Sequence, residues 1–194
     1  MIRIGITGGI GSGKTIVSRL LEIMDIPVFY ADIEAKKITA TSVVIREKLL
    51  ATFGRDLYKN NELDKVSFSR IIFNDRRALT QANAIIHPEV EKAFESWAEK
   101  QNSLFVAQET AILFESGFDK YMDQIITVTA PVETRISRVM KRDSIDREHV
   151  LTRIQNQTSD EEKNKRANYV IVNDGNHSVI SQTVSIMRQI QNSF

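Results

Sequence analysis

The feature that most constrains the fold is a glycine-rich run at residues 8–15, with the sequence Gly-Gly-Ile-Gly-Ser-Gly-Lys-Thr. The run matches the pattern G-x-x-x-x-G-K-S/T, whose glycines let the backbone turn with positive φ and bring N–H groups close to phosphate oxygens. It follows the apolar segment 2–7 and precedes the segment 14–24, in which apolar residues recur at helical spacing. A strand, a phosphate-binding loop and a helix in this order predict the opening of a parallel α/β sheet.

The positions of this run have predicted roles in nucleotide binding. A helix that begins at about Gly13 directs its partial positive charge at the phosphates. Lys14 supplies a mobile cation that reaches the β- and γ-phosphates, and the Thr15 hydroxyl is a ligand for Mg²⁺. A turn that only packs has no need of a lysine followed by a hydroxyl. The predicted nucleotide-binding residues of the run are Gly8, Gly9, Gly11, Ser12, Gly13, Lys14, Thr15 and Ile16.

Five short segments are predicted to be the strands of a buried sheet. Most are apolar runs or β-branched clusters, as expected for strands that are covered on both faces. Helical patterns separate them, and a final amphipathic helix begins at about Val179. Strands that alternate with helices predict an α/β fold with a five-stranded parallel sheet flanked by helices. The strands are expected at residues 2–7, 26–30, 104–108, 124–129 and 169–172.

Two long excursions interrupt this pattern. The first, after the second strand, carries mainly helical signals. In it, Ser42 is expected to cap a helix that ends at Gly54, and Asp64 is expected to cap the next helix. Pro88 is expected in a first helical turn, where a missing N–H is tolerated. The second excursion, residues 131–166, is charge-rich and helical.

The phosphate-binding loop alone does not define a reaction. A GTPase would need a D-x-x-G switch and an N-K-x-D guanine reader, and the sequence has neither, since Asn164-Lys165-Arg166-Ala167 lacks the final aspartate. The chain is also small for a motor. A kinase of small metabolites fits better, because such enzymes surround a compact core with an acceptor-binding insert and a closing lid. We expect a core of residues 1–32, 98–134 and 167–194, a helical acceptor-binding insert of residues 33–97, and a lid of residues 135–166.

Asp32 directly follows the second predicted strand. Ligands of open parallel sheets bind at the carboxyl ends of the strands, so Asp32 is a candidate to orient an acceptor hydroxyl or to help hold the metal. Asp32 is also a reasonable N-cap for a helix over residues 33–38, and the two roles are compatible.

Arg135, Arg138 and Arg142 are spaced at i, i+3 and i+7, which places them on one stripe of a helix. Permanently charged guanidinium groups suit polyphosphates because they bind two oxygens in one plane. We predict that this stripe neutralises the transferred phosphate when the lid closes. The alternative is a solvated charged face, which is the interpretation for the neighbouring Lys141.

The overall composition limits which classes of binding partner are expected. Of 194 residues, 26 are basic and 25 acidic, so the chain lacks a global field that would hold it on nucleic acid or an anionic membrane. It contains no cysteine, which excludes disulfides and thiolate metal sites and fits a reducing compartment. No run approaches a membrane span, and the segment before the glycines is too short for a signal peptide. We expect a cytoplasmic protein without nucleic-acid, membrane or obligatory protein partners.

Several segments recur in the order and spacing of one known family. They are 6–15, Ala31-Asp32, His87-Pro88-Glu89-Val90, Ile112-Leu113-Phe114-Glu115, the arginine stripe with Asp143, Arg153 and Gln157, and 167–175. Through them the chain resembles the dephospho-CoA kinases over nearly its whole length. The glycine-rich loop is common to many nucleotide-binding proteins, whereas the His-Pro, Leu-Phe-Glu and final-strand segments are more specific.

The resemblance implies transfer of the γ-phosphate of ATP, with Mg²⁺, to the ribose 3′-hydroxyl of dephospho-CoA. It implies acceptor-site roles for Asp32, His87 and Glu115, although the residues alone favour a structural role for His87. It also implies that Asn173 binds nucleotide. Glu109 stands where an aspartate is more usual and is expected to be a second carboxylate near the metal. Without the resemblance, another small-molecule or nucleotide kinase and a non-catalytic nucleotide-binding module stay open.

Overall fold

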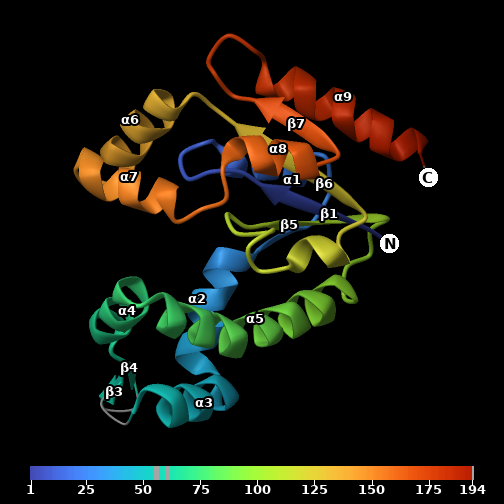
Figure 1. Cartoon of the computed structure of the whole chain (residues 1–194). Coiled ribbons are helices and arrows are strands. Elements are labelled where there is room, and N and C mark those ends of the chain that lie inside the picture. Colours follow the sequence, from blue (N-terminus) through green and yellow to red (C-terminus); the bar gives the residue numbers. More distant parts are fainter. Residues whose placement is uncertain (55–56, 60–61, 194) are drawn as a thin grey trace. The chain divides into compact units, whose positions relative to one another are not determined.

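The computed structural model describes residues 1–54, 57–59 and 62–193 of the chain (Figure 1). The chain divides into two compact units. One consists of residues 1–30 and 101–194, and the other of residues 31–100. Each unit has its own hydrophobic core, and each is described by itself.

The first unit is built on a five-stranded sheet in which all neighbouring strands are parallel, as the sequence predicts. Its strand order is β2-β5-β1-β6-β7. The strands are β1 (Ile2–Thr7), β2 (Val28–Tyr30), β5 (Phe105–Glu109), β6 (Gln124–Thr129) and β7 (Tyr169–Val172). Three strands have the predicted bounds, β2 begins two residues later than predicted, and β5 is shifted by one residue. In the register, Ile6 of β1 lies opposite Glu109 of β5, so both strands end at one edge.

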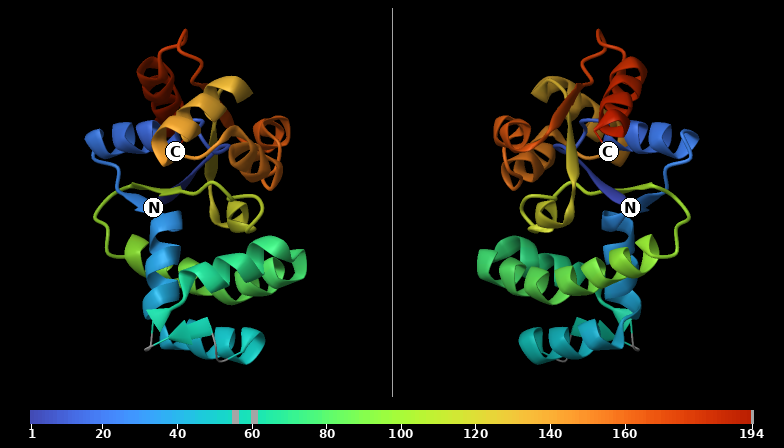
Figure 2. Two further views of the ribbon diagram at one scale, coloured as in Figure 1. Left: turned by 90° about the vertical axis from the view of Figure 1, so that its left-hand side faces the viewer. Right: turned by 90° about the vertical axis from the view of Figure 1, so that its right-hand side faces the viewer.

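Helices cover both faces of this sheet (Figure 2). They are α1 (Lys14–Ile23), α6 (Val132–Asp143), α7 (Arg147–Gln155), α8 (Asp160–Arg166) and α9 (Val179–Asn192), with a 3₁₀ helix at Phe118–Tyr121. Helices α1 and α9 lie side by side on one face, and α8 lies on the other. The predicted charged helical excursion is thus confirmed as α6, α7 and α8.

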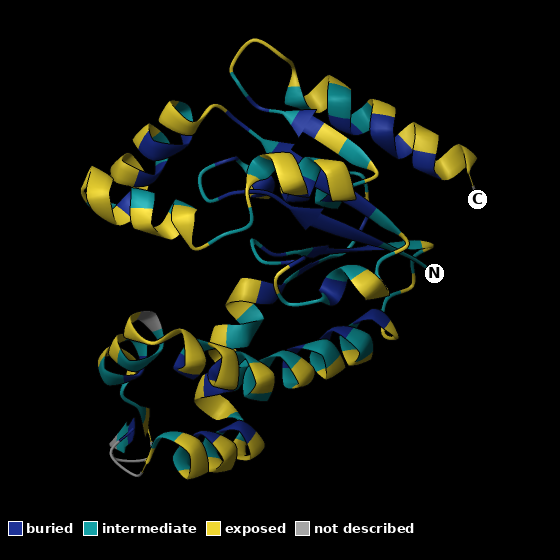
Figure 3. Cartoon of the chain, viewed as in Figure 1, coloured by how far each residue is buried: buried dark blue, intermediate teal, exposed yellow. Residues whose placement is uncertain are grey.

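The alternation of side chains along the strands explains this layering. Strand β1, in the middle of the sheet, has the colour of buried residues along most of its length (Figure 3). In β6, Ile126 and Val128 point into the core under α1 and α9, where Leu21 and Met187 are fully buried. Thr127, between them, points to the other face, and its hydroxyl donates to the Lys163 carbonyl of α8 at 3.5 Å. The apolar face of the sheet therefore positions α1, the helix that begins at the phosphate-binding loop.

The second unit is mainly helical. It contains α2 (Ala31–Thr41), α3 (Val43–Phe53), α4 (Lys65–Asn74), α5 (Arg76–Ala98) and a hairpin of β3 (Tyr58–Lys59) with β4 (Glu62–Leu63). The predicted caps are confirmed. The Ser42 hydroxyl accepts from the Ile45 N–H at 3.3 Å, and Gly54 ends α3. The Asp64 carboxylate accepts from the Ser67 N–H at 3.1 Å at the start of α4.

Two features of this unit differ from the prediction. Pro88 lies inside α5 rather than in a first turn. The buried face of α5 continues on both sides of it, with Ala82 before and Val90 and Phe94 after, and this packing outweighs the loss of one helical hydrogen bond. The hairpin was not predicted, because each of its strands has only two residues and so shows no periodicity.

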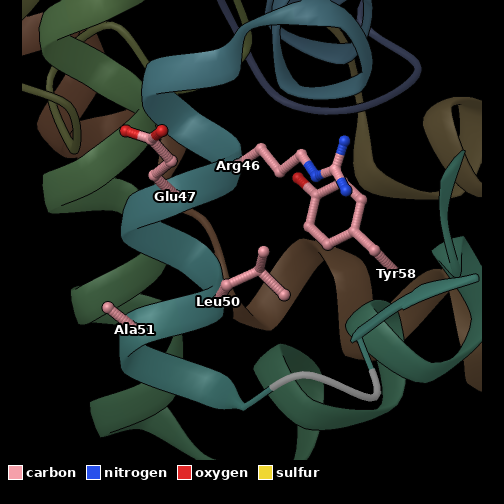
Figure 4. A pocket seen from close by; sticks show the side chains of 5 residues that line it. All are labelled: Arg46, Glu47, Leu50, Ala51 and Tyr58. Carbon is pink, nitrogen blue, oxygen red and sulfur yellow. The ribbon is translucent and has the colours of Figure 1, made fainter. Parts of the chain in front are cut away.

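The helical unit also has a pocket of its own, with a volume of about 490 Å³ (Figure 4). The Arg46 guanidinium lies 5.3 Å from the centroid of the Tyr58 ring, a cation–π contact at its mouth. Its lining residues are Arg46, Glu47, Leu50, Ala51 and Tyr58, none of which is a predicted site residue. Among the described residues, no helix is both long and apolar enough to cross a membrane.

Candidate active site

The phosphate-binding loop connects the end of β1 to the start of α1. Gly13 is the N-cap of α1 with a φ of 99°, a conformation that strongly favours glycine. A Cβ at Gly13 would also lie 2.2 Å from Nδ2 of Asn173, so the loop and the residue after β7 approach closely. The loop thus leads directly into the N-terminus of α1, which is the arrangement that binds phosphate.

Lys14 folds back over this loop. Its side chain is buried, and Nζ donates to the Gly8 carbonyl at 3.1 Å. The ammonium group therefore lies across the loop, where a bound phosphate would replace the Gly8 carbonyl as its hydrogen-bond acceptor. The hydroxyl of Ser12, also in the loop, is buried and has no hydrogen-bond partner among the described residues.

A carboxylate lies beside the first turn of α1. Oε2 of Glu109, the last residue of β5, accepts from the hydroxyls of Thr15 and Ser18, each at 3.3 Å. Thr15 and Glu109, the two predicted metal-binding residues, are thus brought together. Ser18 supplies a third oxygen that was not predicted, although its i+3 spacing from Thr15 on a helix was a usable signal.

Arg135 packs against the loop from α6. Its guanidinium is almost fully buried and donates to Asp160 at 3.0 Å. A Cβ at Gly9 would lie 1.6 Å from Nη1 of Arg135, so the guanidinium occupies the space that a side chain at Gly9 would need. Any larger residue at position 9 would displace the arginine.

Arg138 reaches the loop through Asn173. Its guanidinium donates to the Asn173 carbonyl at 3.2 Å and makes a longer contact of 3.5 Å to the Gly11 carbonyl. The Asn173 amide in turn donates to the Ser12 carbonyl at 2.8 Å. Arg138, predicted to be catalytic, and Asn173, predicted to bind nucleotide, therefore support the same loop.

Arg142, the third residue of the stripe, has a different environment. It is exposed and forms a two-pronged ion pair with Asp143, at 2.7 and 3.0 Å. Asp143 also accepts from Arg153 at 2.9 Å. The stripe therefore joins Arg135 and Arg138 to the loop but leaves Arg142 in a surface network.

The loop also contacts α6, α7 and the residue Gln157 through Ile10. The Ile10 side chain packs against the cluster of Ile136, Val139 and Val150 from α6 and α7. Its N–H donates to Oε1 of Gln157 at 2.9 Å. Gln157, which the sequence analysis noted only as part of the lid resemblance, is thus a direct partner of the loop.

Glu115 lies in the turn after β5. Its Oε1 accepts from the Thr158 N–H at 2.7 Å and pairs with Nζ of Lys163 at 3.2 Å. Burial raises the pKa of Glu115, but the Thr158 hydrogen bond and the Lys163 ammonium lower it by more, so the net pKa lies below its ordinary value. Glu115 is therefore ionised at neutral pH.

Asp32 and His87 belong to the helical unit and are described within it. Asp32 is exposed at the second position of α2, in the first turn rather than before it, so the N-cap prediction is wrong. Its charge still favours the helix N-terminus. His87 is half-buried in α5, and burial lowers its pKa, so the ring is neutral at pH 7 and offers one donor and one acceptor.

The fold and the site together define a P-loop kinase: a parallel α/β sheet, a lysine-bearing phosphate loop, a hydroxyl–carboxylate pair and arginines of α6 beside the loop. The family model of the dephospho-CoA kinases matches residues 2–178 of the chain. A Bacteroides fragilis dephospho-CoA kinase is 43% identical over 187 residues, which cover 96% of this chain and 91% of that protein. The chain therefore belongs to the dephospho-CoA kinase family.

Two solved structures agree with this assignment. A crystal structure of a Thermus thermophilus protein superposes with a TM-score of 0.87 at 33% identity, and covers 97% of this chain and 96% of that one. A Campylobacter jejuni dephospho-CoA kinase superposes with a TM-score of 0.68 at 26% identity, and covers 98% of each chain. The family resemblance predicted from the sequence is confirmed.

Proposed function

We propose that this protein transfers the γ-phosphate of ATP to the ribose 3′-hydroxyl of dephospho-CoA, which yields coenzyme A and ADP. The observation that carries the proposal is the site around the phosphate loop, with Lys14 folded over the loop and Thr15 beside Glu109, in a chain that the family model matches over residues 2–178. The lysine and the loop N–H groups would hold the β- and γ-phosphates.

Magnesium fits the residues present. The described residues contain no cluster of three or more His, Asp or Glu side chains that would form a complete metal site. Mg²⁺ in kinases is instead held by one or two protein oxygens together with substrate phosphates and water. The Thr15 hydroxyl and the Glu109 carboxylate supply such oxygens, 3.3 Å apart. When bound there, the ion would neutralise charge on the phosphates.

The lid arginines would act on the transferred phosphate. Arg138 already lies at the loop, whereas Arg135 would have to share its charge with Asp160, and Arg142 would have to leave Asp143. Closure of residues 135–166 over the nucleotide would also exclude water and so suppress hydrolysis of ATP. We propose that Asn173 completes the nucleotide site.

The acceptor side of the reaction is assigned to Asp32, His87 and Glu115, with specificity carried by residues 33–97. Asp32 would accept or orient the proton of the 3′-hydroxyl. The neutral His87 ring would hydrogen-bond the acceptor rather than attract its charge.

A cytoplasmic location and the absence of nucleic-acid or obligatory protein partners stay predictions from composition.

The acceptor preference tests this proposal. ADP formation is measured with a coupled assay at equal concentrations of dephospho-CoA, AMP, shikimate and pantothenate. We expect dephospho-CoA to stimulate ADP formation far above the others. Equal or greater stimulation by another acceptor would overturn the substrate and leave the kinase class intact. ADP formation that no acceptor changes would contradict the kinase function itself.

A further inference from the structure

Lys163 is a fully buried lysine that the proposed reaction does not use. It lies on α8, on the face of the sheet opposite α1. Its Nζ donates to the Ala111 carbonyl at 2.7 Å and pairs with Oε1 of Glu115 at 3.2 Å. Both partners belong to the turn that follows Glu109, so one ammonium group fixes a segment between a proposed metal residue and a proposed acceptor residue.

The contacts that Glu115 makes with other residues fix one of its two carboxylate oxygens, Oε1. Its Oε1 takes both the Lys163 ammonium and the Thr158 N–H. Among the described residues, the carboxylate has one further donor, the N–H of Glu115 itself, and the side chain keeps 24% of its surface exposed. The carboxylate therefore has one anchored oxygen and one that is available to a hydrogen-bond donor on a ligand.

Lys163 is not needed to hold α8 against the sheet, because other residues of this helix already form ion pairs with neighbouring elements. Asp160, at the start of α8, pairs with Arg135 at 3.0 Å, and Arg166, near its end, pairs with Asp119 at 2.8 Å. The Arg166 guanidinium also lies 4.2 Å from the centroid of the Phe114 ring. Burying an ammonium group costs free energy, and a buried ion pair often adds no net stability compared with an apolar pair of similar volume. A residue that only filled space would not need the charge.

We propose that Lys163 is a positioning residue for the acceptor: it anchors Oε1 of Glu115 so that Oε2 faces a hydroxyl or amide donor of the acceptor. The inference rests on the proposed acceptor role of Glu115. It assigns no contact between Lys163 and either substrate. Its consequence is that the lysine governs acceptor binding and leaves nucleotide binding largely alone.

The test is Lys163→Met, which keeps the length of the side chain and removes the charge. KM for dephospho-CoA and KM for ATP are measured separately, together with the melting temperature. We expect KM for dephospho-CoA to rise by about tenfold or more, as for loss of a hydrogen bond to a charged group, while KM for ATP changes by less than about twofold. A lower melting temperature with KM for dephospho-CoA unchanged would overturn the proposal.

A double-variant cycle keeps the proposal testable if Lys163→Met folds poorly. Glu115→Gln removes the charge that would otherwise be buried without its partner, so the double variant should be at least as stable as Lys163→Met alone. If the lysine acts through Glu115, the double variant and Glu115→Gln should have the same KM for dephospho-CoA within about twofold. A further rise in the double variant would show that the lysine acts by another route and would overturn the proposal.

Arg166→Ala is the matched control, because it removes an ion pair between the same helix and the 3₁₀ helix that follows the turn, without touching Glu115. It should leave KM for dephospho-CoA unchanged. An equal rise in Arg166→Ala would attribute the effect to packing of α8 and overturn the assignment to Lys163. A wild-type protein that does not phosphorylate dephospho-CoA would overturn the proposed function and this inference together, whereas an active wild type with unchanged KM in Lys163→Met overturns the inference alone.

Discussion

At the scale of single residues, Lys14 is the side chain whose loss should cost most activity. Lys14→Ala removes the cation that lies across the loop on the Gly8 carbonyl. We expect the fold to survive and kcat to fall by at least about a hundredfold, because the charge on the transferred phosphate loses its nearest mobile partner. Lys141→Ala, on the exposed side of α6, is the control and should be kinetically silent. Near-normal kcat in folded Lys14→Ala would mean that this loop is not the catalytic site.

At Asp32, one substitution separates a role in catalysis from a role in helix stability. Asp32→Asn keeps the shape and removes the charge in the first turn of α2, which should cost at most about 1 kcal/mol of stability. We expect kcat to fall at least about a hundredfold with binding of an ATP analogue largely kept, because asparagine takes no proton. Glu34→Gln, in the same turn, should match the stability change without the kinetic one. A stable Asp32→Asn variant with normal kcat would direct the search for the base to Glu109.

The residues that the sequence predicted are those whose role is local. The phosphate loop is contiguous, so its turn and its lysine follow from the order of residues 8–15 alone. Lys163 could not be identified in that way, because its burial depends on a turn 52 residues earlier in the chain. From the sequence alone, Lys163 is one of several charged residues in a charge-rich helix.

At the scale of elements, helix α6 carries arginines in different environments. We predict that Arg138→Ala and Arg142→Ala each lower kcat by an amount approaching roughly 10³-fold, because both guanidinium groups act on the phosphates when the lid closes. Lysine at either position should restore activity only in part, since it cannot bind two oxygens in one plane. Steady-state kinetics of the four variants check this. Unchanged kinetics in both alanine variants would return the stripe to a solvated surface role.

Element prediction succeeded for short clusters of apolar and β-branched residues and failed where tertiary packing decides. The strands β1, β6 and β7 have the predicted bounds because each is such a cluster, even though β7 is an edge strand in which Val170 is exposed. The placement of Pro88 failed because the buried face of α5 continues past it. Propensity is a weak guide at such positions, since packing along a 23-residue helix exceeds the cost of one proline.

At the scale of the whole molecule, the sequence predicts a class of fold but not its topology. Alternating strands and helices predict a parallel sheet, whereas the order β2-β5-β1-β6-β7 depends on pairings between distant segments that no local pattern encodes. The compact helical unit of residues 31–100 follows β2 directly in the chain. A parallel core and a separate helical unit are the parts that the proposed reaction requires, one for the nucleotide and one for acceptor specificity.

Following the phosphate itself tests this account most directly. The protein is incubated with ATP labelled in the γ-phosphate and with dephospho-CoA, and the label is located in the products. We predict that it appears on the ribose 3′-oxygen of coenzyme A, in equal amount to the ADP formed, and that a 3′-deoxy analogue of dephospho-CoA receives none. Label found only in inorganic phosphate, or transferred equally to the 3′-deoxy analogue, would contradict the account.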